Sequence, residues 1–176
     1  SADVPTSNNA RLEYTSHSLA RTQALGQLLG ALLCPGDVVC LSGDLGAGKT
    51  AFAQGIGRGW GARERVTSPT FTLVHEHRRA ADGTVFYHVD CYRLGDAGDA
   101  WGIGLEDLWH DDGFVVIEWP EHIQAALPDE RLWIAFTFLG AQQRHLALQA
   151  SGARYVGLLA ALREQLSATG GTGRQR

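Results

Sequence analysis

Eight residues, Gly43 to Thr50, constrain the fold of this chain more than any other stretch. They read G-D-L-G-A-G-K-T, which fits the pattern G-x-x-x-x-G-K-[S/T]. An apolar run at residues 38–41 precedes them, and the residues that follow them, 51–56, favour a helix. A buried strand, a glycine-rich turn and a helix in this order predict a P-loop, where backbone N–H groups at the helix start surround a phosphate.

Two residues of this motif would carry most of its chemistry. Lys49 would reach the β- and γ-phosphates of a nucleotide, and the Thr50 hydroxyl would bind Mg²⁺. Lys49 is also the only lysine among the 15 Lys and Arg residues, and a compact ammonium fits a phosphate cradle better than a planar guanidinium. The sequence therefore predicts ATP or ADP with Mg²⁺ as ligands. The other loop residues expected at the nucleotide are Asp44, which would mainly shape the turn, Leu45, Gly46, Ala47 and Gly48.

Two carboxylates stand at the ends of apolar runs and could complete such a site. Asp90 ends the run 85–89, and Glu118 ends the run 115–117. Nucleotide hydrolysis needs Mg²⁺ held opposite the loop and a water made reactive, which acidic residues can provide. Asp90 and Glu118 are therefore candidate catalytic residues and metal ligands, although each could instead only cap a loop.

Thr70 and Trp119 are further candidates near these runs. Thr70 follows Ser68 and Pro69 and could contact the γ-phosphate or its Mg²⁺ as a switch-loop threonine does, or it could only enter a strand after a proline turn. Trp119 follows Glu118 directly and could pack on the nucleotide site or lie in the core.

Histidines in the same region raise a zinc alternative. His75 and His77 would share one face of a strand, with His88 and Cys91 on the neighbouring segment. Their spacing matches no standard zinc pattern. Partly exposed histidines of a sheet are the favoured interpretation.

The order of apolar and polar stretches predicts an α/β fold, a P-loop NTPase-like mixed β-sheet flanked by helices. Helices are expected from Ser16 or Ser18 to about Leu33, from the P-loop to a glycine-rich stretch at 55–61 that ends it, and from Tyr155 to about Ser167. Strands are expected at 11–15, 38–41, 73–77, 84–90, 114–117, 131–138 and 144–150, with hairpins joining 73–77 to 84–90 and 131–138 to 144–150. Short helical segments are expected within 96–109 and from the end of the stretch 118–121 to Ala126. Residues 1–10 are predicted to be disordered and 169–176 to form a flexible tail, which leaves one domain at 11–168.

Charge and cysteine content narrow the class of protein. A formal net charge of -4 argues against a general nucleic-acid-binding surface. Cys34, Cys40 and Cys91 imply no disulfide framework, so we expect a reducing cytoplasm. No apolar run approaches the length of a membrane span, and no signal-peptide pattern is present.

Several motifs together resemble the TsaE (YjeE) family, the small P-loop ATPases of bacterial tRNA threonylcarbamoyladenosine (t6A) biosynthesis. In order they are the P-loop, then S-P-T-F at 68–71, H-V-D-C-Y-R-L at 88–94, G-L-E-D at 104–107 and I-E-W-P-E at 117–121. The resemblance covers about residues 12 to 150. It implies weak Mg²⁺-dependent ATPase activity and work with the TsaB–TsaD pair, which modifies adenosine 37 of tRNA. Contact with tRNA would then be indirect, through that pair.

The resemblance also implies roles for single residues. Thr50 and Glu118 would match the Mg²⁺ ligands, Asp90 a catalytic or metal-linked carboxylate, and Thr70 the switch-like threonine. Trp119 would lie beside the site.

The resemblance also implies where the adenine pocket lies, and the chain departs from the family pattern at one position. The pocket would include the start of the first helix, near Leu19, and the strand near Arg131. The family usually has a second threonine after Thr50, where this chain has Ala51. Ala51 has no hydroxyl, so a role of a side-chain hydroxyl at position 51 is not expected in this chain.

Two other functions stay open. A small-molecule kinase would suit the size and the P-loop, but such kinases usually carry an arginine-rich lid, and the only paired arginines, Arg78 and Arg79, lie beside a hairpin turn. A non-catalytic switch, whose ATP and ADP states bind a partner differently, would carry the same motifs.

Overall fold

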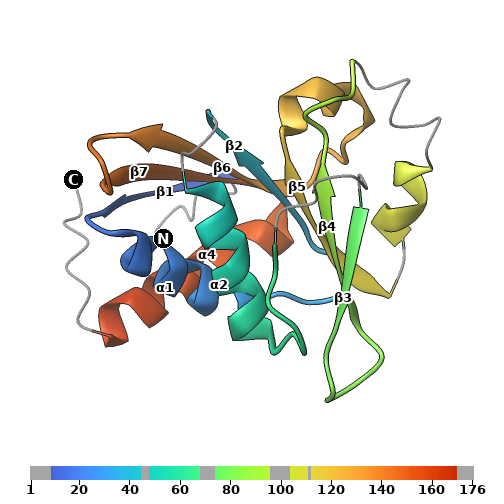
Figure 1. The fold of residues 1–176 in the computed structure, drawn as a ribbon, viewed down its shortest axis with the longest axis horizontal. Helices are drawn as coiled ribbons and strands as arrows, with labels where there is room; N and C mark the ends of the chain where they lie inside the picture. Colours follow the sequence, from blue (N-terminus) through green and yellow to red (C-terminus); the bar gives the residue numbers. More distant parts are fainter. Residues whose placement is uncertain (1–8, 45–47, 68–73, 96–103, 111, 170–176) are drawn as a thin grey trace, which may run out of the picture.

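The computed structural model describes residues 9–44, 48–67, 74–95, 104–110 and 112–169 (Figure 1). In chain order, the elements of these ranges are β1 (Asn9–Ser16), α1 (Leu19–Gly30), β2 (Val38–Ser42), α2 (Lys49–Trp60), β3 (Val74–Arg78), β4 (Val85–Asp90), the 3-10 helix η1 (Leu105–His110), β5 (Gly113–Glu118), the 3-10 helix η2 (Pro120–Ala126), β6 (Arg131–Phe138), β7 (Arg144–Ser151) and α4 (Ala153–Ala168).

Within the described ranges the strands form one seven-stranded mixed sheet, in the order β1-β7-β6-β2-β5-β4-β3. The central strand β2 runs parallel to β6 and β5, and β5 runs parallel to β4. The remaining pairs, β1 with β7, β6 with β7, and β3 with β4, are antiparallel. This confirms the predicted α/β fold and both predicted hairpins.

Helices cover both faces of the central strands, which explains why β2 and β5 carry no polar side chain before their last residues, Ser42 and Glu118. One face carries α1, α2 and α4, which Figure 1 shows gathered together. The other carries the shorter helices η1 and η2. Alternate residues of β2 therefore point into different cores: Val39 and Leu41 lie under the α-helices, and Val38 and Cys40 lie under the 3-10 helices.

The helices α1 and α2 touch backbone to backbone through glycines. A Cβ added to Gly55 or Gly59 of α2 would clash with a carbonyl oxygen of α1, and one added to Gly26 or Gly30 of α1 would clash with a carbonyl oxygen of α2. The glycine-rich stretch does end the second helix as predicted, but only at its last member, Gly61, which follows Trp60 with φ 95°. The helix continues to Trp60 because tertiary contact outweighs the poor helix propensity of glycine.

The first helix begins and ends near the predicted positions. Ser18 caps it, and the Ser18 side chain accepts a hydrogen bond from the backbone N–H of Arg21 at 3.1 Å. The regular helix ends at Gly30, before the predicted Leu33. The strand before it begins at Asn9, whose backbone pairs with Ser151 of β7, rather than at Arg11.

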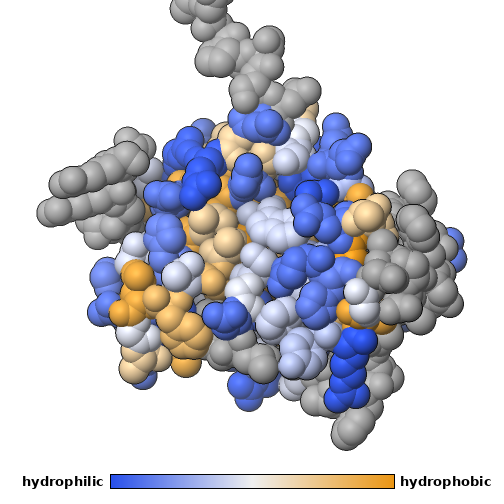
Figure 2. All heavy atoms as spheres, turned by 90° about the horizontal axis from the view of Figure 1, so that it is seen from above, coloured by the Kyte–Doolittle hydropathy of each residue, from blue (hydrophilic) through white to orange (hydrophobic). Residues whose placement is uncertain are grey.

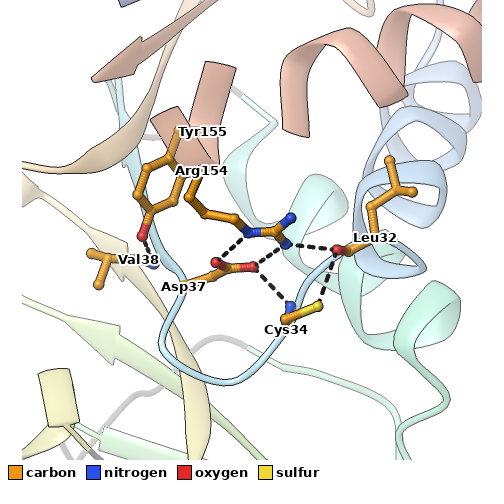
Figure 3. A network of polar contacts seen from close by, with 6 residues as sticks. All are labelled: Leu32, Cys34, Asp37, Val38, Arg154 and Tyr155. Atoms are coloured by element: carbon orange, nitrogen blue, oxygen red, sulfur yellow. Dashed lines mark hydrogen bonds and ion pairs between the residues drawn. The ribbon is translucent and has the colours of Figure 1, made fainter. Parts of the chain in front are cut away.

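A polar network joins the start of α4 to the start of β2 (Figure 3). The Arg154 guanidinium donates to both oxygens of the buried Asp37 carboxylate, from Nε at 2.9 Å and from Nη2 at 2.7 Å. Asp37 also accepts the backbone N–H of Cys34 at 2.7 Å, and the Tyr155 hydroxyl accepts the backbone N–H of Val38 at 2.8 Å. Tyr155 is itself buried, and this burial raises the pKa of its hydroxyl to about 12. The network fixes the end of β2 that lies opposite the P-loop.

The face drawn in Figure 2 is mainly polar, with apolar residues in separate patches. Within the described residues, the large apolar side chains that stay exposed are Leu19, Tyr92, Phe138 and Leu139. The described helices include none that is both long enough and apolar enough to cross a membrane.

Candidate functional site

The carboxyl end of β2 leads into the P-loop, and α2 begins there at Lys49. Gly48 precedes the helix with φ 94°, a left-handed conformation that glycine adopts without strain. Among the described residues no side chain caps this helix, so its first turn presents backbone donors and the positive end of the helix dipole at the site. Such a helix start is suited to binding a phosphate.

The Lys49 side chain is held at this edge by two contacts. Its Nζ atom donates to the carbonyl oxygen of Gly43 at 2.7 Å and lies 3.9 Å from the centre of the Trp119 ring. Lys49 is only 4% exposed. Burial lowers the pKa of Lys49, and the negative charges of Glu118, Glu121, Asp90 and Asp44 act against that shift. The ammonium is thus largely removed from water and surrounded by groups that favour its charge.

The two predicted carboxylates lie side by side beneath the start of α2. Asp90 of β4 and Glu118 of β5 are register partners in the parallel pair. Because alternate residues of a strand share a face, Glu118 lies on the same face as Phe114 and Val116, which pack under the α-helices. Glu118 is 6% exposed, and Asp90 accepts the backbone N–H of Tyr92 at 2.9 Å. The sheet therefore brings both carboxylates to the edge where Lys49 lies.

The Glu118 carboxylate has a buried partner on the neighbouring strand. Its Oε2 atom lies 2.7 Å from Nε2 of His88, a residue with no exposed surface. From the sequence, His88 was a candidate only for the zinc alternative and a member of the family motif.

Trp119 adopts a left-handed conformation, with φ 59°, and is the only non-glycine residue with positive φ in the described ranges. Its ring contacts Tyr92, with centres 5.0 Å apart, and His122, with centres 5.6 Å apart. His122 in turn bonds the carbonyl oxygen of Cys91 through Nδ1 at 2.9 Å. This aromatic group fixes the ring over the Lys49 ammonium, so Trp119 lies at the site rather than in the core.

The structure brings one of the two predicted adenine-pocket residues to this edge. Leu19 starts α1, and one turn further on the methyl group of Thr22 lies 3.7 Å from where a Cβ on Gly48 would stand. Arg131 is not brought there. It begins β6, level with the start of β2, and its guanidinium donates to the carbonyl oxygen of Pro128. Arg131 therefore lies at the opposite end of the strands, about 13 Å away along β2 at roughly 3.3 Å per residue.

An arginine that sequence analysis did not select lies against the P-loop instead. The aliphatic Cγ of Arg144 is 3.6 Å, and its Nε 3.7 Å, from where a Cβ on Gly48 would stand. Its Nη1 donates to the carbonyl oxygens of Gly140 and Gln143, each at 2.9 Å, and its guanidinium stacks 4.2 Å from the centre of the Phe138 ring. The sequence carried no local signal for this position, because the β6–β7 hairpin delivers it from far along the chain.

The structure describes only some of the remaining predicted site residues. Leu45, Gly46, Ala47 and Thr70 lie outside the described residues. Asp44 is exposed at the end of the described part of the loop, and Thr50 is the second residue of α2. In the described part of the chain, no three His, Cys, Asp or Glu side chains form a group that could hold a metal ion, so nothing supports the zinc alternative.

The donor set at this edge suits Mg²⁺ rather than zinc. Thr50, Glu118 and Asp90 offer only oxygen atoms, which Mg²⁺ prefers, and Mg²⁺ commonly takes one or two carboxylates together with phosphate oxygens and water. The buried ammonium, the uncapped helix start and the paired carboxylates could together bind a nucleotide with its metal ion.

Comparison with known proteins finds one family and a solved structure with a similar fold. The family model of the threonylcarbamoyl adenosine biosynthesis protein TsaE matches residues 16–146. The tRNA threonylcarbamoyladenosine biosynthesis protein TsaE of Bacillus subtilis is 38% identical over 146 residues, covering 82% of this chain and 89% of that protein. The TsaE of Streptomyces coelicolor is 40% identical over 139 residues, covering 74% of this chain and 91% of that protein. The crystal structure of B. subtilis YdiB superposes with a TM-score of 0.75 at 34% identity, covering 89% of this chain and 97% of that one.

Proposed function

The chain belongs to the TsaE family, and on that premise we propose that it is a slow Mg²⁺-dependent ATPase that serves tRNA t6A biosynthesis in the cytoplasm. The observation that carries the proposal is the arrangement at the carboxyl edge of the sheet. The buried ammonium of Lys49 lies at an uncapped helix start, and the buried carboxylate of Glu118 stands at the same edge beside Asp90. A phosphate group and a metal ion need these charges in this relation.

The proposed roles follow from the position of each described group and, for Thr70 and residues 45–47 of the P-loop, from the sequence motifs. Backbone N–H groups of the P-loop and the Lys49 ammonium hold the phosphates, while Thr50 and Glu118 hold Mg²⁺. Bound Mg²⁺ supplies positive charge that neutralises the phosphate oxygens. Asp90 orients a water molecule or the water ligands of the metal, and Thr70 senses the γ-phosphate.

Exposed apolar side chains around the site support a protein partner, which we propose to be the TsaB–TsaD pair. Leu19 starts α1, Tyr92 follows β4, and Phe138 and Leu139 stand at the end of β6, each between 43% and 54% exposed. All four therefore surround the edge that carries the P-loop. Exposed apolar groups next to a polar site offer a surface that a partner could cover. Any tRNA would be reached through that partner, because the chain itself has a net charge of -4.

Steady-state ATP hydrolysis tests the proposal. We expect low turnover by the chain alone, a clear increase when the TsaB–TsaD pair is added, and none for Lys49→Ala under either condition. No response to the pair, together with phosphate transfer to a small acceptor, would overturn the proposal in favour of a kinase.

A change at Glu118 separates an ATPase from a non-catalytic switch. Glu118→Ala should abolish turnover while ATP binding in the absence of Mg²⁺ is retained, because the carboxylate acts on the metal and not on the phosphates directly. Loss of partner binding alone, with turnover unchanged, would favour the switch.

A further inference from the structure

His88 and Glu118 form a buried pair directly behind the carboxylate that the proposed function assigns to Mg²⁺. His88 stands on β4 two residues before Asp90, and its Nε2 lies 2.7 Å from Oε2 of Glu118 on β5. Neither side chain is more than 7% exposed. The contact therefore lies in a region of low dielectric constant, where a hydrogen bond to a carboxylate is strong.

The location of the proton in this contact follows from the two groups. Glu118 in its proposed role as a metal ligand is an ionised carboxylate, which only accepts hydrogen bonds, so in that role Nε2 of His88 is the donor. Nδ1 of His88 is buried and has no hydrogen-bond partner among the described residues. A second proton on Nδ1 would be a buried donor without an acceptor, which is costly. The geometry therefore makes Nε2 of His88 the donor of the contact with Glu118.

We propose that His88 is a positioning residue for Glu118, a role that rests on the proposed function. By occupying Oε2, His88 restricts the rotation of the carboxylate and leaves Oε1 to take the metal ion. A ligating carboxylate that is held by such an outer hydrogen bond binds its metal more tightly than a freely rotating one. His88 itself touches neither nucleotide nor metal.

Binding of a fluorescent ADP analogue tests the role without measuring turnover. Its affinity is measured first in EDTA and then across a titration with Mg²⁺, for the wild type, His88→Leu and His88→Gln. We expect His88→Leu to keep its affinity in EDTA within about twofold and to need about 10-fold more Mg²⁺ for half of the metal effect. A Gln amide can place an N–H group near the position of Nε2, so His88→Gln should restore most of the loss.

His77→Leu is the matched control. His77 lies on the adjacent strand, its ring packs against Phe86 with centres 5.3 Å apart, and its buried Nε2 has no hydrogen-bond partner among the described residues. It should show the Mg²⁺ dependence of the wild type. In a Glu118→Ala background, His88→Leu should add no further loss, because its effect passes through the carboxylate.

Several outcomes would overturn the inference. One is a His88→Leu variant with wild-type Mg²⁺ dependence, and another is an equal loss of affinity in EDTA and in Mg²⁺. Imidazole ¹⁵N spectra of the wild type provide a test that needs no variant, since a proton found on Nδ1 rather than Nε2 contradicts the assignment. If the wild type binds no ADP at all, the proposed function falls and the inference falls with it. Normal Mg²⁺ binding by the wild type and by His88→Leu alike overturns the inference alone.

Discussion

The ammonium of Lys49 lies 3.9 Å from the centre of the Trp119 ring, while the same nitrogen donates to the carbonyl oxygen of Gly43 at 2.7 Å. A lysine side chain is flexible, and holding it in one place has an entropic cost. The contacts with the Trp119 ring and the Gly43 carbonyl already hold the Lys49 side chain in the free protein, so ligand binding does not have to offset this entropic cost. The positive charge is therefore already at the edge where a phosphate would bind.

Lys49→Arg should not replace the lysine. The space between the ring and the carbonyl oxygen suits a compact ammonium, and a planar guanidinium has a different shape and reach. We expect ADP to bind roughly 10- to 100-fold more weakly to both Lys49→Arg and Lys49→Ala, which corresponds to the loss of one hydrogen bond to a charged group. Titration with a fluorescent ADP analogue measures the affinity, and thermal unfolding checks that the variants are folded. Wild-type affinity of the Arg variant would contradict this account.

Gly59→Ala should destabilise the fold, because its new methyl group would meet the carbonyl oxygen of Gln27 on α1. We expect a loss of about 1–3 kcal/mol in the free energy of unfolding, the usual cost of overpacking. Gly157 of α4 is the matched control, since a Cβ there has no neighbour within 4 Å. Gly157→Ala should stabilise the fold by about 0.5–1 kcal/mol. Urea unfolding of both variants measures the contrast, and equal effects would show that the close contact of α1 and α2 is not required.

Arg154→Ala should leave the carboxylate of Asp37 buried without its charged partner. Asp37 is 3% exposed, whereas the Arg154 side chain is 42% exposed, so solvent reduces the effect. We expect a loss of about 2 kcal/mol in the free energy of unfolding, below the range for fully buried pairs. Arg163→Ala, which removes one exposed hydrogen bond to the carbonyl oxygen of Arg11, should cost less than about 0.5 kcal/mol. Similar losses in the two variants would argue against the network as an anchor of α4.

His77 should make the stability depend on pH. Burial, together with the neighbouring His88 and His75, lowers the pKa of His77 from 6.5 to about 4. Between these values the unfolded chain binds a proton that the folded chain does not, so the free energy of unfolding falls as pH falls from 6.5 to about 4. For a half-buried group we expect about 1–2 kcal/mol across this window. Urea unfolding should show a smaller pH dependence for His77→Phe than for the wild type, and the exposed His17→Phe serves as the control. An unchanged slope in His77→Phe would contradict the prediction.

The sequence could predict those features that local chemistry determines. The P-loop motif predicted that β2 is followed by α2. Ser18, a typical N-cap residue, indicated where α1 begins. Turn residues between apolar runs indicated both hairpins. Each strand-end carboxylate could be identified because it follows a mostly apolar strand. The parallel pairing of β4 with β5 then sets Asp90 beside Glu118.

Features that depend on contacts between distant segments could not be predicted. Arg131 and Arg144 begin adjacent antiparallel strands, so they lie at opposite ends of the hairpin, and only the sheet order shows which end meets the P-loop. The pairing of His88 with Glu118 depends on how β4 and β5 are aligned in the sheet. These two strands lie far apart in the sequence, so the sequence alone does not give their alignment. The glycines of α2 indicate a helix end until the backbone of α1 is placed against them.

The glycine contact between α1 and α2 also restricts which substitutions this sequence can accept during evolution. Backbone carbonyl groups of the opposite helix lie against four glycines, Gly26 and Gly30 of α1 and Gly55 and Gly59 of α2. A backbone carbonyl cannot move aside as a flexible side chain can. No one of these positions can accept a larger residue unless the opposite helix shifts as a whole. Because α2 carries Lys49 at its first position, such a shift would displace the phosphate-binding end as well. Variation at these four positions is thus tied to the site, although none of them touches it.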